Sequence, residues 1–129
     1  MPARLKLNYF TPLPPERTAI AEFSVDVLSA LAELADVTVW TYQAEWTPIA
    51  NLEVRRFDAA TDPAPIHAAA MTFFNMGNNF AYHAEIYAAM RRIPGTVILH
   101  DPNLQYFFYS MATASAAGRR HYLSAAARH

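Results

Sequence analysis

A histidine and an aspartate stand where the sequence changes from an apolar, strand-like run to a helix-like segment. His100 and Asp101 directly follow Val97–Leu99 and precede Pro102. Imidazole exchanges a proton near neutral pH, so a histidine at such a junction is suited to acid–base chemistry on a bound ligand. The alternative interpretation is structural: Asp101 caps the following helix, and His100 hydrogen-bonds to a loop carbonyl. We take His100 and Asp101 as the candidate catalytic pair, with both interpretations open.

A second polar cluster follows another apolar run. Asn75, Gly77 and Asn78 come at the end of Met71–Asn75 and ahead of a helical segment. Free N–H groups at a helix N-terminus attract anions and sugar hydroxyls, which makes these three residues candidates for substrate binding. A tight turn followed by a helix cap explains the same residues equally well.

Metal and thiol chemistry are not indicated. His83 lies one turn into the helix and Glu85 follows two positions later, but residues two apart on a helix do not share a face. No other His, Asp or Glu residues have the spacing of metal ligands, and the chain has no cysteine. We therefore expect neither a metal ion nor another cofactor.

Glycine-rich motifs are also missing. The three glycines are Gly77, Gly95 and Gly118, and none belongs to a GxGxxG, GxxxxGK[ST] or GxSxG motif. Their absence argues against a simple NAD or ATP enzyme and against a serine hydrolase with a nucleophile elbow.

Composition limits the remaining classes. The 129 residues are 53% hydrophobic and 16% charged, with a net charge of −1. A chain of this kind folds around a core as one domain over residues 1–129, and it lacks the basic excess of a nucleic-acid binder. It has no apolar run long enough for a transmembrane segment and no signal-peptide pattern at its start, so we expect a cytoplasmic protein.

Alternating strand and helix patterns must position the candidate residues. Strands are predicted over 4–9, 37–40, 52–57, 71–75 and 97–99, and helices over 18–34, from about 66, over 80–92, and from 102 to the end. Thr18 is the expected N-cap of the first long helix, whose inner face is predicted to carry Ile20, Phe23, Val27, Leu28, Leu31 and Leu34. Asp101 is the expected N-cap of the last helix, with Pro102 at its first position.

This alternation predicts an α/β fold with a doubly wound, mainly parallel Rossmann-like sheet in three layers. In the usual strand order 3-2-1-4-5, the first and fourth strands are neighbours, and ligands bind beyond their carboxyl ends. The fully apolar run Val97–Leu99 is expected in the sheet interior. Five strands are fewer than the six or seven that such domains often have, so we expect part of a longer protein or a minimal domain.

Three segments resemble the N-terminal domain of group-1 glycosyltransferases with the GT-B fold. They are Pro-Leu-Pro-Pro-Glu-Arg-Thr-Ala-Ile-Ala-Glu-Phe (12–23), Phe-Asn-Met-Gly-Asn-Asn (74–79) with Tyr82-His83, and Val-Ile-Leu-His-Asp (97–101). Their order and spacing agree with the family over about residues 4–110.

The resemblance implies transfer of a sugar from a nucleotide-sugar donor to an acceptor, without a metal ion. It implies that the loop at 14–20, with Thr18 and Ala19, approaches the donor phosphates, and that His100 lies near the transferred sugar; His83 joins the substrate-binding candidates. One departure is Ala19, where the family usually has glycine. The implied donor-binding domain is absent from this chain, so we expect no activity from the chain alone.

A second hypothesis is a free-standing Rossmann-like binding or interaction module without catalysis. Neither hypothesis involves nucleic acid. Apolar surface left exposed on a partial domain would favour self-association into a homo-oligomer.

Overall fold

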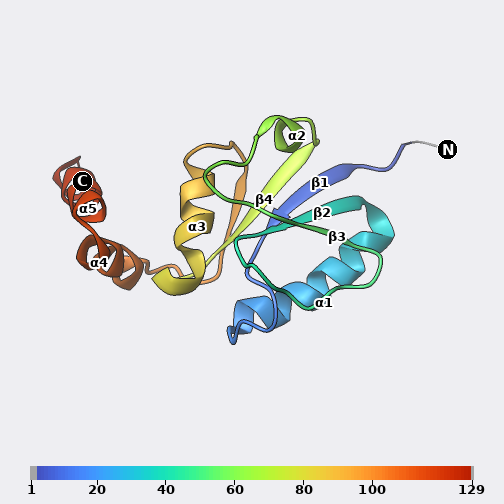
Figure 1. Ribbon diagram of the computed structural model, residues 1–129, viewed down its shortest axis with the longest axis horizontal. Coiled ribbons are helices and arrows are strands. Elements are labelled where there is room, and N and C mark those ends of the chain that lie inside the picture. Colours follow the sequence, from blue (N-terminus) through green and yellow to red (C-terminus); the bar gives the residue numbers. More distant parts are fainter. Residues whose placement is uncertain (1–2, 129) are drawn as a thin grey trace.

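Five parallel strands form a single sheet in the computed structural model, which describes residues 3–128 (Figure 1). The strands are β1 (Lys6–Phe10), β2 (Asp36–Thr41), β3 (Glu53–Arg56), β4 (Met71–Met76) and β5 (Thr96–Leu99). The helices are α1 (Ala19–Leu34), α2 (Ala64–His67), α3 (Phe80–Met90), α4 (Gln105–Ala114) and α5 (Ala116–Arg128). The strand order is β3-β2-β1-β4-β5, which confirms the predicted α/β Rossmann-like topology with β1 and β4 adjacent.

Alternating side chains of β1 enter two separate cores. Leu7 and Tyr9 join Leu28 of α1 on one face of the sheet. Phe10 faces the other side, where it packs with Phe74, Trp40 and Ile86 of α3. A strand buried on both faces is the expected consequence of helices on both sides of a parallel sheet, so the doubly wound arrangement is confirmed.

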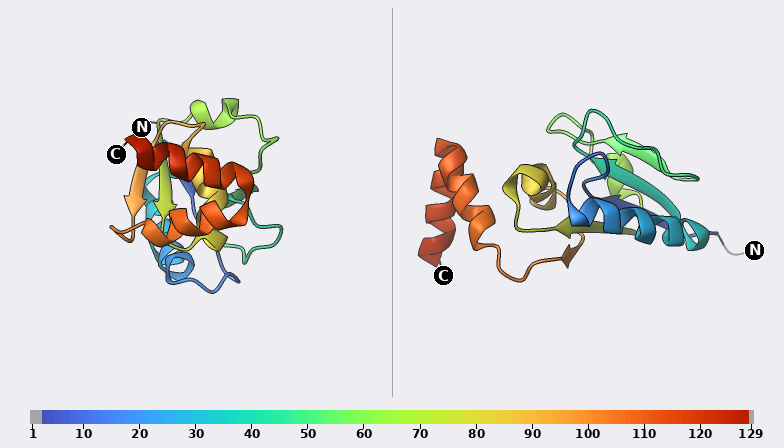
Figure 2. Two further views of the ribbon diagram at one scale, coloured as in Figure 1. Left: turned by 90° about the vertical axis from the view of Figure 1, so that its left-hand side faces the viewer. Right: turned by 90° about the horizontal axis from the view of Figure 1, so that it is seen from below.

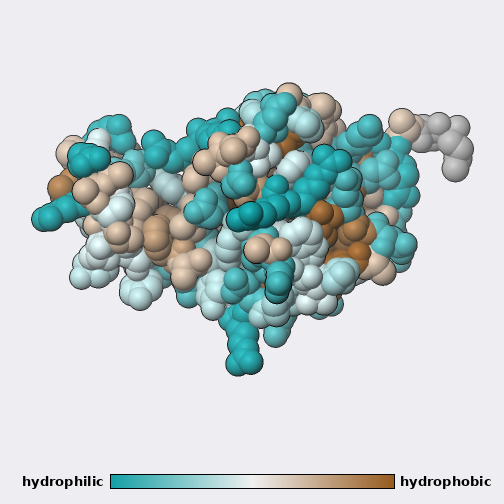
Figure 3. Space-filling model, viewed as in Figure 1, coloured by the Kyte–Doolittle hydropathy of each residue, from teal (hydrophilic) through white to brown (hydrophobic). Residues whose placement is uncertain are grey.

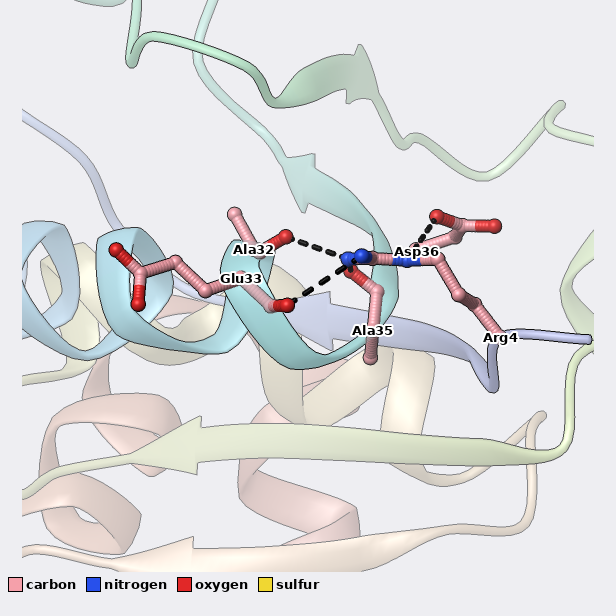
Figure 4. A network of polar contacts seen from close by, with 5 residues as sticks. All are labelled: Arg4, Ala32, Glu33, Ala35 and Asp36. Atoms are coloured by element: carbon pink, nitrogen blue, oxygen red, sulfur yellow. Dashed lines mark hydrogen bonds and ion pairs between the residues drawn. The ribbon is translucent and has the colours of Figure 1, made fainter. Parts of the chain in front are cut away.

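Arg4 fixes the end of α1 against the sheet. The last carbonyls of a helix have no partner within the helix, and the last turn of α1 has no basic residue. The Arg4 guanidinium donates to the carbonyls of Ala32 and Ala35, at 2.6 and 2.8 Å, and pairs with the Asp36 carboxylate at 3.0 Å. A longer bond of 3.3 Å to the Glu33 carbonyl completes the network (Figure 4). Arg4, which precedes β1 in the sequence, therefore supplies hydrogen-bond donors to the free carbonyls at the C-terminus of α1.

The inner face of α1 agrees with the prediction only in part. Leu28 is buried and Val27 and Leu31 pack against the core, but Phe23 and Leu34 are 47% and 76% exposed, and Ala21 and Ser24 are buried instead. The helix is rotated so that small side chains meet the sheet and the polar Ser24 enters the core. Phe23 consequently lies at the surface beside the carboxyl end of the sheet.

The interior position predicted for Val97–Leu99 is wrong. β5 is an edge strand that pairs only with β4, and Val97 and Leu99 are 40% and 49% exposed. The opposite edge strand, β3, carries charged residues and an ion pair between Arg55 and Glu53. The apolar run at positions 97–99 does form a strand, but its composition does not show whether the strand has neighbours on one side or on both.

The predicted helix start at Asp101 and Pro102 is also wrong. The Asp101 carboxylate accepts a hydrogen bond from Asn103 N at 2.9 Å, and the Asn103 side chain accepts one from Gln105 N at 2.9 Å. These two successive side-chain turns delay α4 until Gln105.

The single C-terminal helix that we predicted is two helices. The chain breaks at Ser115, whose backbone is extended (φ −158°, ψ 160°) and whose hydroxyl accepts from Gly118 N at 2.9 Å as an N-cap for α5. The resulting α4–α5 hairpin lies beyond α3 at one end of the molecule (Figure 2). Phe107 packs against Phe80 and Tyr87 of α3, and the Tyr87 hydroxyl is 2.6 Å from His121 Nε2.

No helix within residues 3–128 has the length and apolar character needed to cross a lipid bilayer. The contact with Tyr87 makes His121 part of the interface between α3 and α5, and His129 lies outside the described residues.

We predict that Arg4→Ala lowers the free energy of unfolding by about 1–2 kcal/mol, because three carbonyls at the end of α1 lose a charged donor. Arg4→Lys should recover only part of this loss, since one ammonium group cannot reproduce the guanidinium fork. Urea denaturation measures the change. The matched control is Arg55→Ala, which removes an exposed arginine paired with Glu53 and should cost less than about 0.5 kcal/mol. Equal losses for the two alanine variants would contradict the capping role.

Candidate functional site

A cleft of about 470 Å³ opens at the carboxyl end of the sheet, between the N-terminus of α1 and the loops that follow β4 and β5. Its lining residues are Thr18, Ala19, Ile20, Phe23, Gly77, Asn78, His100 and Asp101. Six of these are site residues predicted from the sequence. The cleft therefore lies where the strand order reverses, which is where open α/β sheets bind ligands.

The two remaining predicted residues, Asn75 and His83, lie beneath the cleft. They are 0% and 1% exposed, so neither offers a side chain to the cleft surface. Their contribution is to support the residues above them.

The Asn75 amide is the centre of a buried hydrogen-bond network. Its nitrogen donates to the hydroxyls of Thr11 at 3.1 Å and Ser24 at 2.8 Å. Its oxygen accepts from the Tyr9 hydroxyl at 3.3 Å and lies 2.8 Å from His100 Nε2. Both donor and both acceptor positions of the amide are thus occupied, which is what burial of a polar side chain requires.

This network fixes the tautomer of His100. Since Asn75 presents its oxygen, His100 Nε2 must carry the hydrogen, and a neutral ring then has its lone pair on Nδ1. Partial burial lowers the pKa of His100 below its usual value, which favours the neutral ring at pH 7. The Phe23 ring meets the imidazole edge-on, with the centroids 5.2 Å apart. His100 is thus an oriented hydrogen-bond acceptor at the rim of the cleft.

His83 is a neutral, buried histidine. Burial lowers its pKa to about 4, although a nearby backbone group of Asn75 opposes the shift. Its Nδ1 atom has no hydrogen-bond partner. A buried polar atom without a partner costs free energy, so this position is held in place by the packing around it.

Gly77 allows the β4–α3 loop to lie against α1. A Cβ atom at this position would lie 2.6 Å from Ile20 Cδ1 and 2.8 Å from His83 Nε2. Real Cβ atoms essentially never show such distances, so a larger residue would force the Ile20 and His83 side chains or the loop to shift. Glycine is favoured here by a close approach within the protein and not by its backbone conformation.

The N-terminus of α1 forms the second wall of the cleft. Thr18 is its N-cap, as predicted, and the Thr18 hydroxyl accepts from Ile20 N at 3.3 Å. Ala19 follows as the first helical residue. Its methyl group stands where a ligand phosphate would approach the helix dipole.

Asn78 and Asp101 line the cleft but have local partners. The Asn78 side-chain oxygen accepts from Phe107 N at 2.9 Å and so anchors the first turn of α4. The Asp101 carboxylate holds the turn described above through Asn103 N. Asp101 forms no contact with His100 like that of an aspartate–histidine pair in acid–base catalysis; the imidazole is oriented by Asn75 instead.

Our sequence analysis missed Tyr9, Thr11 and Ser24 as supporting residues. The one sequence signal for this network was Ser24, a polar residue on an otherwise apolar face of the helix. No group of three or more His, Asp or Glu residues between positions 3 and 128 is arranged to hold a metal ion.

In comparisons with known proteins, no family model matches the chain, and neither a curated protein nor a solved structure shows significant similarity to it.

We predict that His83 makes the protein less stable in mild acid. Its pKa is about 4 in the folded protein and near 6.5 when the chain is unfolded, so the unfolded state binds a proton first as the pH falls. The free energy of unfolding should therefore fall between pH 6.5 and pH 4, with a contribution from His83 of up to about 1.4 kcal/mol per pH unit. His83→Gln should flatten this dependence in urea denaturation at several pH values.

His67→Gln, which changes an exposed histidine of α2, is the control and should leave the pH dependence as it is. If His83→Gln retained the full slope, His83 would not be the buried neutral group described here.

Proposed function

We propose that this chain is the acceptor-side domain of a glycosyltransferase that uses a nucleotide-sugar donor. The observation that carries the proposal is the cleft at the strand-order reversal, which has a helix N-terminus on one wall and an oriented, neutral imidazole on the other. The helix N-terminus suits the negative charge of a donor diphosphate, and the imidazole suits a sugar or acceptor hydroxyl.

In this proposal each predicted residue has a defined task. His100 Nδ1 accepts a hydrogen bond from a hydroxyl of the reacting sugars, and Asn75 positions the ring through Nε2. Thr18 and Ala19 form the end of α1 that faces the donor phosphates. Gly77 and His83 keep this helix end close to the β4–α3 loop. Asp101 and Asn78 shape the rim.

The proposal assigns most donor contacts to a second domain facing this cleft. Charge that develops on the leaving diphosphate needs stabilisation from groups that the described cleft lacks: Thr18 and Ala19 bring no cationic side chain to it. The proposal also retains the predictions of a cytoplasmic protein, of no metal ion or other cofactor, and of self-association into a homo-oligomer.

The second candidate is a binding module without catalysis. It is favoured by the local roles of Asp101 and Asn78, which leave His100 as the one titratable side chain oriented at the cleft rim. The two candidates differ in what the loss of the His100 imidazole does.

We predict that His100→Ala, in the enzyme assembled with its donor-binding domain, lowers turnover on the order of 10²-fold or more because a group acting in the transition state is removed. The melting temperature should change little, since His100 is partly exposed. Steady-state kinetics and thermal unfolding measure the two quantities. His67→Ala on α2 is the control and should alter neither.

A His100→Ala variant with lower stability and near-normal turnover would identify a structural histidine and favour the binding module. Unchanged stability together with unchanged turnover would remove His100 from the site.

We predict that the 129-residue chain alone shows no transferase turnover and at most weak donor binding, with dissociation constants on the order of 1 mM. The physical reason is that no cationic side chain among the described residues lines the cleft and that the methyl group of Ala19 stands at the helix end. Titration calorimetry with UDP-glucose and GDP-mannose measures the affinity. Ala19→Gly should strengthen binding if a phosphate approaches this helix end. Tight, stoichiometric binding to the unmodified chain would overturn the two-domain proposal.

A further inference from the structure

The α4–α5 hairpin has a charge opposite to that of the rest of the molecule. Residues 102–128 contain Arg119, Arg120 and Arg128 and no Asp or Glu. Since the whole chain has a net charge of −1, the remaining residues have a net charge of −4. A separation of charge of this kind directs one end of a protein toward anionic surfaces.

The arginines of the hairpin have no acidic partner within the molecule. Among residues 3–128, the arginines in ion pairs are Arg4 and Arg55, both far from the hairpin in the sequence. Arg91, at the end of α3, adds to the positive charge: the pKa of His121 is lowered first by burial and then by the charges of Arg91 and Arg128. The positive charge at this end of the molecule is therefore free to attract an external anion.

Apolar side chains are exposed beside these charges. Tyr106, Tyr109 and Leu123 are 62%, 58% and 57% exposed. Arg119 and Arg120 precede Leu123 by four and three positions, so the three residues share one face of α5. Hydrophobic and hydrophilic residues accordingly lie side by side at this end of the molecule (Figure 3). Tyrosines, arginines and leucine together are typical of helices that lie in the headgroup region of a bilayer.

Hollows also border this surface. Tyr109, Arg119 and Leu123 line a groove of about 710 Å³. Tyr109 also lines a second hollow of about 510 Å³, which shares Asn78 and Asp101 with the cleft at His100. Neighbouring hollows that share lining residues thus lie between the exposed hairpin surface and the cleft.

We propose that the hairpin surface, formed by Tyr106, Tyr109, Arg119, Arg120 and Leu123, docks on a membrane that contains anionic phospholipid. A second copy of the hairpin would bring like charges together without any acidic residue to pair them, so it is the less suitable occupant. Nucleic acid would use the positive charge but would leave Leu123 without an apolar environment. Docking would place the groove lined by Tyr109, Arg119 and Leu123 beside the bilayer. This inference goes beyond the proposed function and does not depend on it.

Sedimentation with lipid vesicles tests the proposal. The unmodified chain should bind vesicles of phosphatidylglycerol and phosphatidylcholine, bind pure phosphatidylcholine vesicles far more weakly, and lose anionic binding as salt is raised. The double variant Arg119→Gln/Arg120→Gln should lower the partition coefficient on the order of tenfold or more. Tyr109→Ser/Leu123→Ser should lower it as well, which a purely electrostatic attraction would not explain.

The matched control is Arg55→Gln/Arg56→Gln, which removes two adjacent arginines from the opposite edge of the sheet. It should change the partition coefficient by less than about twofold, with folding of every variant checked by circular dichroism. Three outcomes would overturn the proposal: no binding to anionic vesicles, equal losses for the control and the hairpin variant, or binding to a single-stranded oligonucleotide in preference to vesicles.

Discussion

The burial of one amide side chain determines how the functional end of this protein is built. Asn75 is 0% exposed at the end of β4, and an amide in that position must find partners for two N–H groups and an oxygen. The partners come from the end of β1, from α1 and from the residue after β5: Tyr9, Thr11, Ser24 and His100. Three segments, separated by up to 91 residues of sequence, are therefore positioned by one group on β4. Movement of Thr11 or Ser24 away from the amide would leave one of its buried N–H groups unpaired, at a cost of about 1–3 kcal/mol.

The same constraint explains the chemistry available at the cleft. A histidine at the rim of an open cleft would ordinarily change tautomer and rotamer freely. Here the Asn75 amide oxygen accepts a hydrogen bond from Nε2, and the Phe23 ring packs edge-on against the imidazole. Gly77 allows α1 to approach closely enough for Ser24 to contact Asn75. The result is an imidazole whose orientation is set before any ligand arrives, which is the condition for efficient proton transfer or hydrogen bonding. His83 is buried at the same junction, where the side chains of Ile20 and His83 both lie close to Gly77.

The sequence was informative where a pattern depends on local physics. Alternation of strand and helix predicted the parallel sheet, Thr18 predicted the start of α1, and the polar residues at the strand ends predicted the cleft. It was uninformative where the outcome depends on distant partners. Val97 and Leu99 are as apolar as core residues, yet they stand at a sheet edge because no further strand covers them. Aspartate is a common helix N-cap, but here the Asp101 carboxylate accepts from Asn103 N and the Asn103 side chain accepts from Gln105 N, so a turn forms before the helix begins. The role of Asn75 could not be predicted, because its four partners are brought together only by the fold.

The two ends of the sheet are stabilised by different means, and this difference bears on function. At the amino end of the sheet, Arg4 closes α1 with charged hydrogen bonds near solvent, an arrangement that tolerates small movements because water can replace a lost contact. At the carboxyl end, the hydroxyls and the amide around Asn75 are shielded from water, so replacement is not available. Rigidity is therefore concentrated beneath the cleft. The α4–α5 hairpin beyond it is attached through an aromatic cluster around Phe107, the hydrogen bond from Phe107 N to Asn78 and the hydrogen bond between Tyr87 and His121. A hairpin attached in this way can adjust to a surface without disturbing His100, because the network that orients the imidazole includes no residue of α4 or α5.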